Sequence, residues 1–323
     1  MARRNKRSHT WIYLIWGLNG VVIISLLIAG TFYRTNQHAL AADGLTEPPR
    51  PGSTQKPPPT RYFLPTLTPN PFYTPPVFET PTPFVLENGG THATIIGFSL
   101  AGRPIEAYTF GEGKREYLIV AGIHGGYEGN TVALANELIM YINANPEVIP
   151  DSAKLYIIRN MNPDGEARSS DVEGRVNNNG VDLNRNFPSE NWVADWDRDG
   201  CWVLRPTTGG LYGGSEPETR TVMGFISSHK LAALISYHSA ALGVFPGGVP
   251  WEEVSKRLAK ALSKETRYPY PPIDTGCEYT GTLADWAVEN GVGAAVDMEL
   301  STHKNTDFDR NLKALKVFLN FIP

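Results

Sequence analysis

A short apolar stretch that ends in a histidine, two glycines, a tyrosine and a glutamate constrains the fold of this chain more than any other feature. Residues 118–123 form an apolar run with the length of a buried strand, and residues 131–142 carry apolar side chains at helical spacing. His124 and Glu128 therefore lie on a predicted strand-to-helix turn. In open α/β sheets such turns face a crevice where ligands bind.

The two side chains on this turn are of kinds that bind metal ions. An imidazole nitrogen and a carboxylate oxygen both suit Zn²⁺, which binds them at about 2.0–2.2 Å. Two ligands do not complete a site. A solvated loop in which His124 and Glu128 are merely neighbours explains this stretch equally well, so the choice depends on the rest of the chain.

From residue 86 onward, strand and helix patterns alternate. Strands are expected at residues 93–98, 105–110, 116–120, 154–159, 232–237 and 294–299. Helices are expected from residue 131, from residue 217, and at residues 251–265, 283–289 and 306–321. A long loop rich in Gly, Asn and Asp spans residues 162–214. This order predicts one α/β domain over residues 86–323, in which a mixed, mostly parallel sheet carries helices on both faces.

The amino-terminal segment has the composition of a membrane anchor. Residues 1–9 are strongly basic, and residues 11–33 are apolar with Asn19 as their only strongly polar side chain. About 20 apolar residues span a bilayer, whereas the apolar core of a cleaved signal peptide has about 7–15. Residues 1–33 are therefore expected to be a cytoplasmic basic tail and a transmembrane signal anchor, with the rest of the chain outside the cytoplasm. A signal peptide cleaved near residues 39–42 is the alternative, and would make the protein secreted.

Residues 34–85 form a linker rich in Pro and Thr. The stretch lacks an apolar period and repeats short Pro-containing motifs, which favour extended polyproline II conformation. We expect a spacer between the membrane and the domain. Its aromatic residues, such as Tyr62 and Phe63, leave open a role in binding.

Charge and cysteine content bound the expected partners. The formal net charge is −4, and no basic block occurs beyond the amino-terminal tail, so nucleic acid is not an expected partner. Cys201 and Cys277 are the only cysteines. Outside the cytoplasm they can form a disulfide, and two free thiols are equally compatible with the sequence.

Further segments along the chain carry a family resemblance. They are IIGFSLAGRPIEAY at residues 95–108, VDLNRNFP at 181–188, GGSEPETRTVMGFI at 213–226, SYHS at 236–239 and DMEL at 297–300. Together with the histidine turn, and in this order, they resemble the zinc metallocarboxypeptidases related to carboxypeptidase A over essentially the whole globular part. The resemblance implies a carboxypeptidase-like α/β/α fold, one bound Zn²⁺, and hydrolysis of a peptide bond next to a free C-terminal carboxylate.

The resemblance also implies the metal ligands and the general base. The ligands fall on His124, Glu128 and His238, each at or just beyond the end of an apolar strand run. The general base falls on Glu299, because a carboxylate near metal-activated water can take its proton and deliver it to the leaving amine. Asp297 shares the strand face of Glu299 and competes for that role.

The substrate-binding residues are implied in the same way. The carboxylate clamp falls on Asn184 and Arg185, because the planar fork of an arginine can hold a carboxylate through two hydrogen bonds. Arg175 takes the place of the arginine that stabilises the developing oxyanion, and Arg168 in the same loop is its alternative. Tyr279 is the nearest candidate for the tyrosine that covers the substrate.

Two features depart from the family pattern. The family spaces its first two ligands as HxxE, whereas this chain has one residue more between His124 and Glu128; the two glycines between them can adopt backbone angles closed to other residues. The segment that would select the substrate side chain, around residues 282–285, does not align. The expected function is a membrane-anchored, extracytoplasmic zinc carboxypeptidase. The alternatives are a cell-wall peptidase that cuts the bond from γ-D-glutamate to a diamino acid, and a non-catalytic surface binding module with the same fold.

Overall fold

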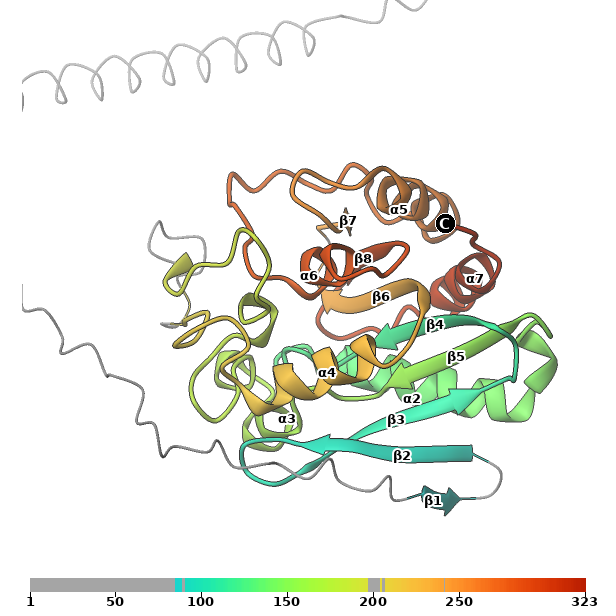
Figure 1. Ribbon diagram of the computed structural model, residues 1–323, viewed down its shortest axis with the longest axis horizontal. Helices are drawn as coiled ribbons and strands as arrows, with labels where there is room; N and C mark the ends of the chain where they lie inside the picture. The colour runs from blue at the N-terminus through green and yellow to red at the C-terminus, as the bar shows by residue number, and fades with distance from the viewer. Residues whose placement is uncertain (1–84, 89–90, 197–203, 205–206, 241) are drawn as a thin grey trace, which may run out of the picture. The chain divides into compact units, whose positions relative to one another are not determined.

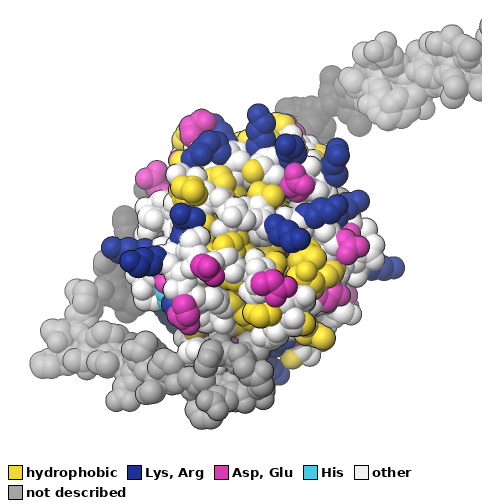
Figure 2. All heavy atoms as spheres, turned by 90° about the vertical axis from the view of Figure 1, so that its right-hand side faces the viewer, with side chains coloured by type: hydrophobic (Ala, Val, Ile, Leu, Met, Phe, Trp, Pro, Cys, Tyr) yellow, Lys and Arg dark blue, Asp and Glu magenta, His cyan; other side chains and the backbone are white. Residues whose placement is uncertain are grey.

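The computed structural model describes residues 85–88, 91–196, 204, 207–240 and 242–323. The predicted membrane anchor (residues 1–33) and all but the last residue of the predicted linker (residues 34–85) lie outside this part of the chain. Among the helices that are described, none combines the length and the apolar character needed to cross a bilayer. On the face shown in Figure 2, basic and acidic side chains are interspersed, so neither charge dominates it.

An eight-stranded sheet forms the centre of the described domain (Figure 1), with the strand order β1-β2-β3-β5-β4-β6-β8-β7. The strands are β1 (Val85–Asn88), β2 (Thr91–Phe98), β3 (Pro104–Phe110), β4 (Arg115–Val120), β5 (Ala153–Ile158), β6 (Leu231–Ser239), β7 (Val244–Pro246) and β8 (Ala295–Leu300). The sheet is mixed, as predicted from the sequence.

Its parallel part is limited to the four central strands, β5, β4, β6 and β8. Four of the seven strand pairs are antiparallel, namely β1–β2, β2–β3, β3–β5 and β7–β8. The expectation of a mostly parallel sheet was therefore wrong. For the β2–β3 pair the physical reason is the connection: the turn at residues 99–103 joins the two strands, and so short a connection permits only an antiparallel hairpin.

Helices cover both faces of the sheet, as predicted. On one face, α2 (Gly129–Ala144), α5 (Glu253–Thr266) and α7 (Phe308–Leu319) pack on apolar side chains of the central strands. The other face is covered by α4 (Pro217–Ser227), by α6 (Leu283–Glu289) and by part of the long loop. Strand β4 contributes to both layers: Tyr117 and Ile119 join the first, whereas Leu118 joins the second. A strand buried on both sides explains why β4 appears in the sequence as a continuous apolar run.

The long loop is folded rather than irregular. It contains the short helix α3 (Pro163–Arg168) and the 3₁₀ turns η2 (Val172–Gly174) and η3 (Leu183–Arg185). The Asn162 side chain caps α3 by accepting a hydrogen bond from the Gly165 amide at 2.9 Å, and the Asp182 side chain caps η3 from the Asn184 amide at 3.0 Å. These caps satisfy backbone donors that would otherwise lack partners and fix the loop beside the ends of the central strands.

Candidate active site

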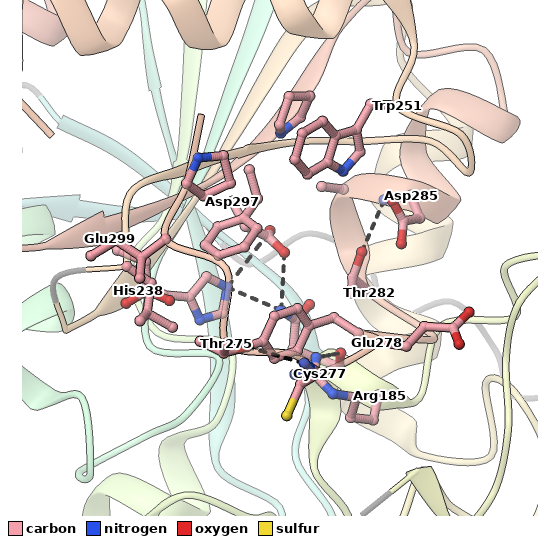
Figure 3. A pocket seen from close by; sticks show the side chains of 18 of the residues that line it. Arg185, His238, Trp251, Thr275, Cys277, Glu278, Thr282, Asp285, Asp297 and Glu299 are labelled. Atoms are coloured by element: carbon pink, nitrogen blue, oxygen red, sulfur yellow. Dashed lines mark hydrogen bonds and ion pairs between the residues drawn. The ribbon is translucent and has the colours of Figure 1, made fainter. Parts of the chain in front are cut away.

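A cavity of about 1090 Å³ lies where the central strands end and the long loop and residues 271–285 meet. Every site residue assigned from the sequence lines it: His124, Glu128, Arg175, Asn184, Arg185, His238, Tyr279 and Glu299. Cys277 also lines the cavity and is disulfide-bonded. The only other cysteine of the chain, Cys201, lies outside the described residues. Figure 3 shows this pocket with His238 and Glu299 beside each other and Arg185 on another side.

Two histidines and a glutamate converge within the cavity. The Nδ1 atoms of His124 and His238 are 3.3 Å apart, and the Glu128 carboxylate lies 2.8 Å from the first and 3.3 Å from the second. All three residues are buried, and their ligand atoms lie within 4.8 Å of one another. Two imidazole nitrogens and one carboxylate oxygen around a common point form the donor set of a catalytic zinc site that leaves a fourth position for water.

In each imidazole, Nδ1 faces the cluster and Nε2 points away from it. The partner of each Nε2 favours metal binding by Nδ1. His124 Nε2 lies 3.1 Å from Asp182 Oδ1, and His238 Nε2 lies 2.9 Å from Ser236 Oγ. A proton on Nε2 that is donated outward leaves the Nδ1 lone pair directed at the common point. The residues present therefore fit a Zn²⁺ ion.

The electrostatics of the cluster favour a positive charge there. Burial alone would raise the pKa of Glu128, but His124 and His238 lower it below its usual range. Burial alone would lower the pKa of His238, but the Asp297 and Glu128 carboxylates raise it to about 10. A divalent cation supplies this positive charge in place of protons.

The two glycines accommodate the additional residue between His124 and Glu128. Gly125 adopts a φ of +46°, in the left-handed region that favours glycine. Gly126 lies so close to the long loop that a Cβ atom there would meet the Ser169 carbonyl oxygen at 2.0 Å. The longer spacing thus leaves the two ligands in contact, and it requires glycine at positions 125 and 126.

Glu299 and Asp297 lie on the same face of β8 but have different surroundings. Asp297 Oδ1 lies 3.7 Å from Nε2 of His238, the nitrogen turned away from the cluster, while Oδ2 accepts a hydrogen bond from Asn184 at 3.2 Å. Glu299 Oε2 is buried without a hydrogen-bond partner among the described residues. Burial and then repulsion from Glu128 raise the pKa of Glu299 to about 8. Glu299 is therefore the carboxylate beside the ligand cluster.

Arg185 is held between two aromatic rings. Its guanidinium carbon lies 4.3 Å from the centre of the Trp196 ring and 5.1 Å from that of Tyr279. Nη1 donates to the Asn184 carbonyl oxygen at 2.5 Å, and the buried Nε has no partner in the described part of the chain. A fixed guanidinium with an unsatisfied donor is suited to binding an anion.

Arg175, rather than Arg168, reaches the ligand cluster. Its Nε and Nη2 atoms lie 2.9 and 2.8 Å from Asp182 Oδ2, and Nη1 lies 3.3 Å from His124 Nδ1 and 3.5 Å from Glu128 Oε1. Arg168 is exposed and donates instead to two backbone carbonyl groups of the long loop. Of the two arginines, Arg175 is therefore the one that lies at the ligand cluster.

Sequence reasoning missed two residues that organise the site. Asp182 joins His124 to Arg175, and Trp196 covers Arg185. A signal for Asp182 was present, because it stands two residues before the clamp residue Asn184. No signal marked Trp196, which is one of 7 tryptophans in the chain.

A mixed α/β domain with a buried cluster of two histidines and a glutamate, a neighbouring carboxylate and two cavity-lining arginines defines a zinc metallopeptidase. The model of the zinc carboxypeptidase family, peptidase family M14, matches residues 88–316. The chain belongs to this family, and its cofactor is zinc.

Relatives of the chain include both carboxypeptidases and an amidase. Murein peptide amidase A of Escherichia coli strain K12 is 32% identical over 204 residues, which cover 60% of this chain and 75% of that protein. Carboxypeptidase D of Mus musculus is 30% identical over 176 residues, which cover 47% of this chain and 12% of that protein. The family relationship therefore leaves open which kind of bond is cut.

Solved structures share the fold. Bovine thrombin-activatable fibrinolysis inhibitor, solved with a tick carboxypeptidase inhibitor, matches with a TM-score of 0.59 at 21% identity, over 71% of this chain and 89% of that one. The murein-tripeptide amidase of Escherichia coli O157 matches with a TM-score of 0.54 at 22% identity, over 72% and 92% of the two chains.

Proposed function

We propose that the protein is a carboxypeptidase that hydrolyses the peptide bond next to a free C-terminal carboxylate. The observation that carries this proposal is Arg185, a buried guanidinium fixed between Trp196 and Tyr279 with a donor that lacks a partner. A terminal carboxylate offers the charge and the two acceptors that such a group binds. Arg185 lines the same cavity as the ligand cluster. A substrate whose terminal carboxylate binds Arg185 can therefore place its last peptide bond at the ligand cluster.

Each catalytic role falls to a residue with suitable surroundings. His124, Glu128 and His238 would hold the zinc ion, which when bound supplies a Lewis acid and lowers the pKa of a coordinated water to about 7. Glu299 takes the proton of the attacking water and delivers it to the leaving amine. Its unpartnered Oε2 beside the cluster supports this role. A bound cation opposes the repulsion that raises its pKa.

The remaining roles are electrostatic. Arg175 stabilises the negative charge that develops on the carbonyl oxygen, since Nη1 lies at the edge of the ligand cluster. Asp182 positions both Arg175 and His124. Asn184 acts with Arg185 on the terminal carboxylate, and the amide of Leu283 fixes its side chain by donating to Oδ1 at 2.8 Å.

A second candidate function is cleavage of cell-wall peptides at the bond from γ-D-glutamate to a diamino acid. The similarity to murein peptide amidase A over 75% of its length favours this reading. A diamino acid also carries a free carboxylate for Arg185. A non-catalytic binding module is disfavoured, because a general base and both arginines accompany the complete ligand set.

We further propose that the catalytic domain is anchored in the membrane and lies outside the cytoplasm. The basic residues 1–9 followed by the apolar residues 11–33 support an anchor with this orientation. The disulfide at Cys277 supports an oxidising compartment.

The test compares peptides that differ only at the carboxyl end. The zinc-loaded protein should cut peptides with free ends and resist their amidated forms. Arg185→Ala should lower kcat/KM by about 30-fold to several thousand-fold, the range that corresponds to losing one partner of a desolvated charge pair. Arg185→Lys should recover part of this loss, because it restores charge without the planar fork.

Each candidate function predicts a different outcome. Preferred cleavage of a cell-wall tripeptide over ordinary peptides would select the second candidate. Equal cleavage of free and amidated peptides, with Arg185→Ala behaving as the unaltered protein, would contradict the carboxypeptidase proposal.

A further inference from the structure

His303 lines the cavity from the loop between β8 and α7, and none of the roles assigned above uses it. Its ring packs against that of Tyr127, with the ring centres 4.7 Å apart. Tyr127 precedes the ligand Glu128 in the chain, and its ring centre lies 5.9 Å from the guanidinium carbon of Arg175. His303 therefore lies on the side of the ligand cluster where Arg175 is.

Asn130 ties the loop that carries His303 to the start of α2. It is the second residue of this helix and is 6% exposed. Its Nδ2 donates to the carbonyl oxygens of Thr302 and Asn305, at 2.6 and 2.9 Å. Because a carbonyl oxygen can only accept, these two contacts place the amide nitrogen of Asn130 on the side of the loop and leave its Oδ1 for another partner.

Ser239, at the end of β6, is that partner, and it also contacts His303. Its Oγ lies 3.1 Å from Asn130 Oδ1 and 2.9 Å from His303 Nδ1. Since Asn130 Oδ1 can only accept, the single hydroxyl proton of Ser239 is donated to it. The contact with His303 then requires a proton on Nδ1, which donates to Ser239 Oγ. In the neutral imidazole this leaves the lone pair on Nε2.

The lone pair of His303 Nε2 has a fixed direction and lacks a protein donor. Ser239 holds the ring at Nδ1, and Tyr127 packs against the ring. Among the residues that the structure describes, none donates a hydrogen bond to Nε2. A fixed acceptor on a residue that lines the substrate cavity is suited to positioning a substrate through one of its hydrogen-bond donors.

The binding mode proposed above indicates which donor this is. The terminal carboxylate lies at Arg185, which Figure 3 shows away from Glu299, across His238. The attacked carbonyl group lies at Arg175, so the substrate chain before the cut bond continues on the side where His303 lies. The first hydrogen-bond donor in that direction is the N–H of the residue whose carbonyl is attacked.

We propose that Nε2 of His303 accepts a hydrogen bond from the N–H of the substrate residue before the cut bond, and that Asn130 and Ser239 are positioning residues that fix the tautomer of His303. This inference rests on the proposed function, because it takes the sites of the terminal carboxylate and of the attacked carbonyl from it. It predicts that peptides with proline or an N-methylated residue before the cut bond are poor substrates, since both lack this N–H.

The first test compares two substrates of the zinc-loaded full chain. One is an N-acetyl-alanyl dipeptide that ends in the residue cut fastest, and the other is its O-acetyl-lactyl counterpart, in which an ester oxygen replaces the N–H and the cut bond is the same. The kcat/KM for the peptide should be about fivefold to tenfold higher, the range for one hydrogen bond between neutral groups. His303→Ala should lower the value for the peptide by this factor and reduce the preference to less than about twofold.

Lys304→Ala is the matched control for His303→Ala. Lys304 is the next residue of the same loop, is exposed, and does not line the cavity. This variant should keep the preference for the peptide over the ester analogue.

A second measurement tests the positioning residues without catalysis. Nitrogen NMR of protein labelled at histidine distinguishes a protonated ring nitrogen from one with a lone pair, and the signals of His303 are those lost in His303→Gln. Nδ1 should carry the proton in the unaltered protein. Ser239→Ala removes its acceptor, and Asn130→Ala frees the Ser239 hydroxyl to donate to Nδ1. Both variants should move the proton to Nε2 and lose the preference for the peptide, while zinc content is retained.

The outcomes separate the inference from the function on which it rests. Equal kcat/KM for the two substrates, or a preference that persists in His303→Ala, would overturn the acceptor role and leave the carboxypeptidase intact. A proton on Nε2 in the unaltered protein would overturn the tautomer. If neither substrate is cut, the proposed function fails and binding still decides the inference. N-acetyl-alanine should then shift the Nε2 signal of His303 and O-acetyl-lactic acid should not, whereas equal effects of the two would overturn it.

Discussion

Glu299 and His238 occupy paired positions on neighbouring strands, yet their side chains have separate proposed roles, and substitution should separate them. Glu299→Gln should keep zinc and lose about 10²- to 10⁴-fold in turnover, because a general base contributes to rate without holding the ion. His238→Ala should lose zinc and turnover together. Metal content and kcat, measured on the same samples, check both. A mild Glu299→Gln beside an inactive Asp297→Asn would show that the roles of the two carboxylates are exchanged.

Asp285 should make stability depend on pH. Burial and then the charge of Asp297 raise its folded-state pKa from the ordinary value of 3.8 to about 6, so stability is lost as pH rises from about 4 through 6, where the unfolded chain ionises first. Asp285→Asn removes this loss. Relative to the unaltered protein, its free energy of unfolding should therefore gain up to about 3 kcal/mol between pH 4 and pH 7.5.

Urea unfolding of both proteins in the presence of a chelator measures this difference without contributions from metal binding. A gap between the two proteins that stays constant over this pH range would show that the Asp285 carboxyl is not destabilised by its surroundings.

Among single residues, the functional residues that belong to a family motif could be predicted from the sequence. Functional residues that belong to no motif, and that reach the site only through the folding of the loop, were missed. His124, Glu128 and His238 were assigned by resemblance and do converge. The contact of Trp196 with Arg185 belongs to no periodic pattern. It depends on how the long loop folds, and a loop has no apolar period from which its path could be predicted.

Among elements, the turn between β4 and α2 has the most specific sequence requirement. Gly126→Ala should shift this turn, because the added Cβ would meet a backbone oxygen, Ser169 O at 2.0 Å, that cannot rotate away. The shift should weaken zinc binding and cost about 1–3 kcal/mol of stability.

Gly129→Ala is the matched control. Gly129 is the first residue of α2, nothing lies within 4 Å of an added Cβ, and alanine favours a helix by up to about 1 kcal/mol. Zinc affinity should stay unchanged in this variant. A normal zinc affinity in Gly126→Ala would mean that the turn tolerates displacement.

Long elements were predicted well, and short ones were not. The helix predicted at residues 251–265 overlaps α5, which spans Glu253–Thr266, and the strand predicted at residues 232–237 lies within β6. Strands β1 and β7 were missed because they have four and three residues, too few to show a period of two. Pairing with β2 and β8 defines them instead, and such pairing is a tertiary property.

For the whole molecule, the predicted anchor places the chain in a membrane. The anchor residues, 1–33, lie outside the described part of the chain, so this location stays a prediction. The full chain should stay with membranes through an alkaline wash and be released by detergent, because residues 11–33 are long enough to span the bilayer. Deletion of residues 1–33 should yield a soluble protein. Protease added outside the membrane should digest the catalytic domain. A soluble full-length chain inside the cytoplasm would contradict the proposed location.

The pairing of His238 with Glu299 across β6 and β8 also bears on how such an enzyme can diversify. The spacing of their backbones is set by the ladder between neighbouring strands, about 4.8 Å in any sheet, and no exchange of side chains alters it. The cavity wall opposite, residues 271–285, belongs to a loop and the start of a short helix. Mutations in this loop can therefore change which substrate side chains the cavity binds, while the sheet keeps His238 and Glu299 at a fixed separation. The enzyme can then act on new substrates with the same catalytic residues.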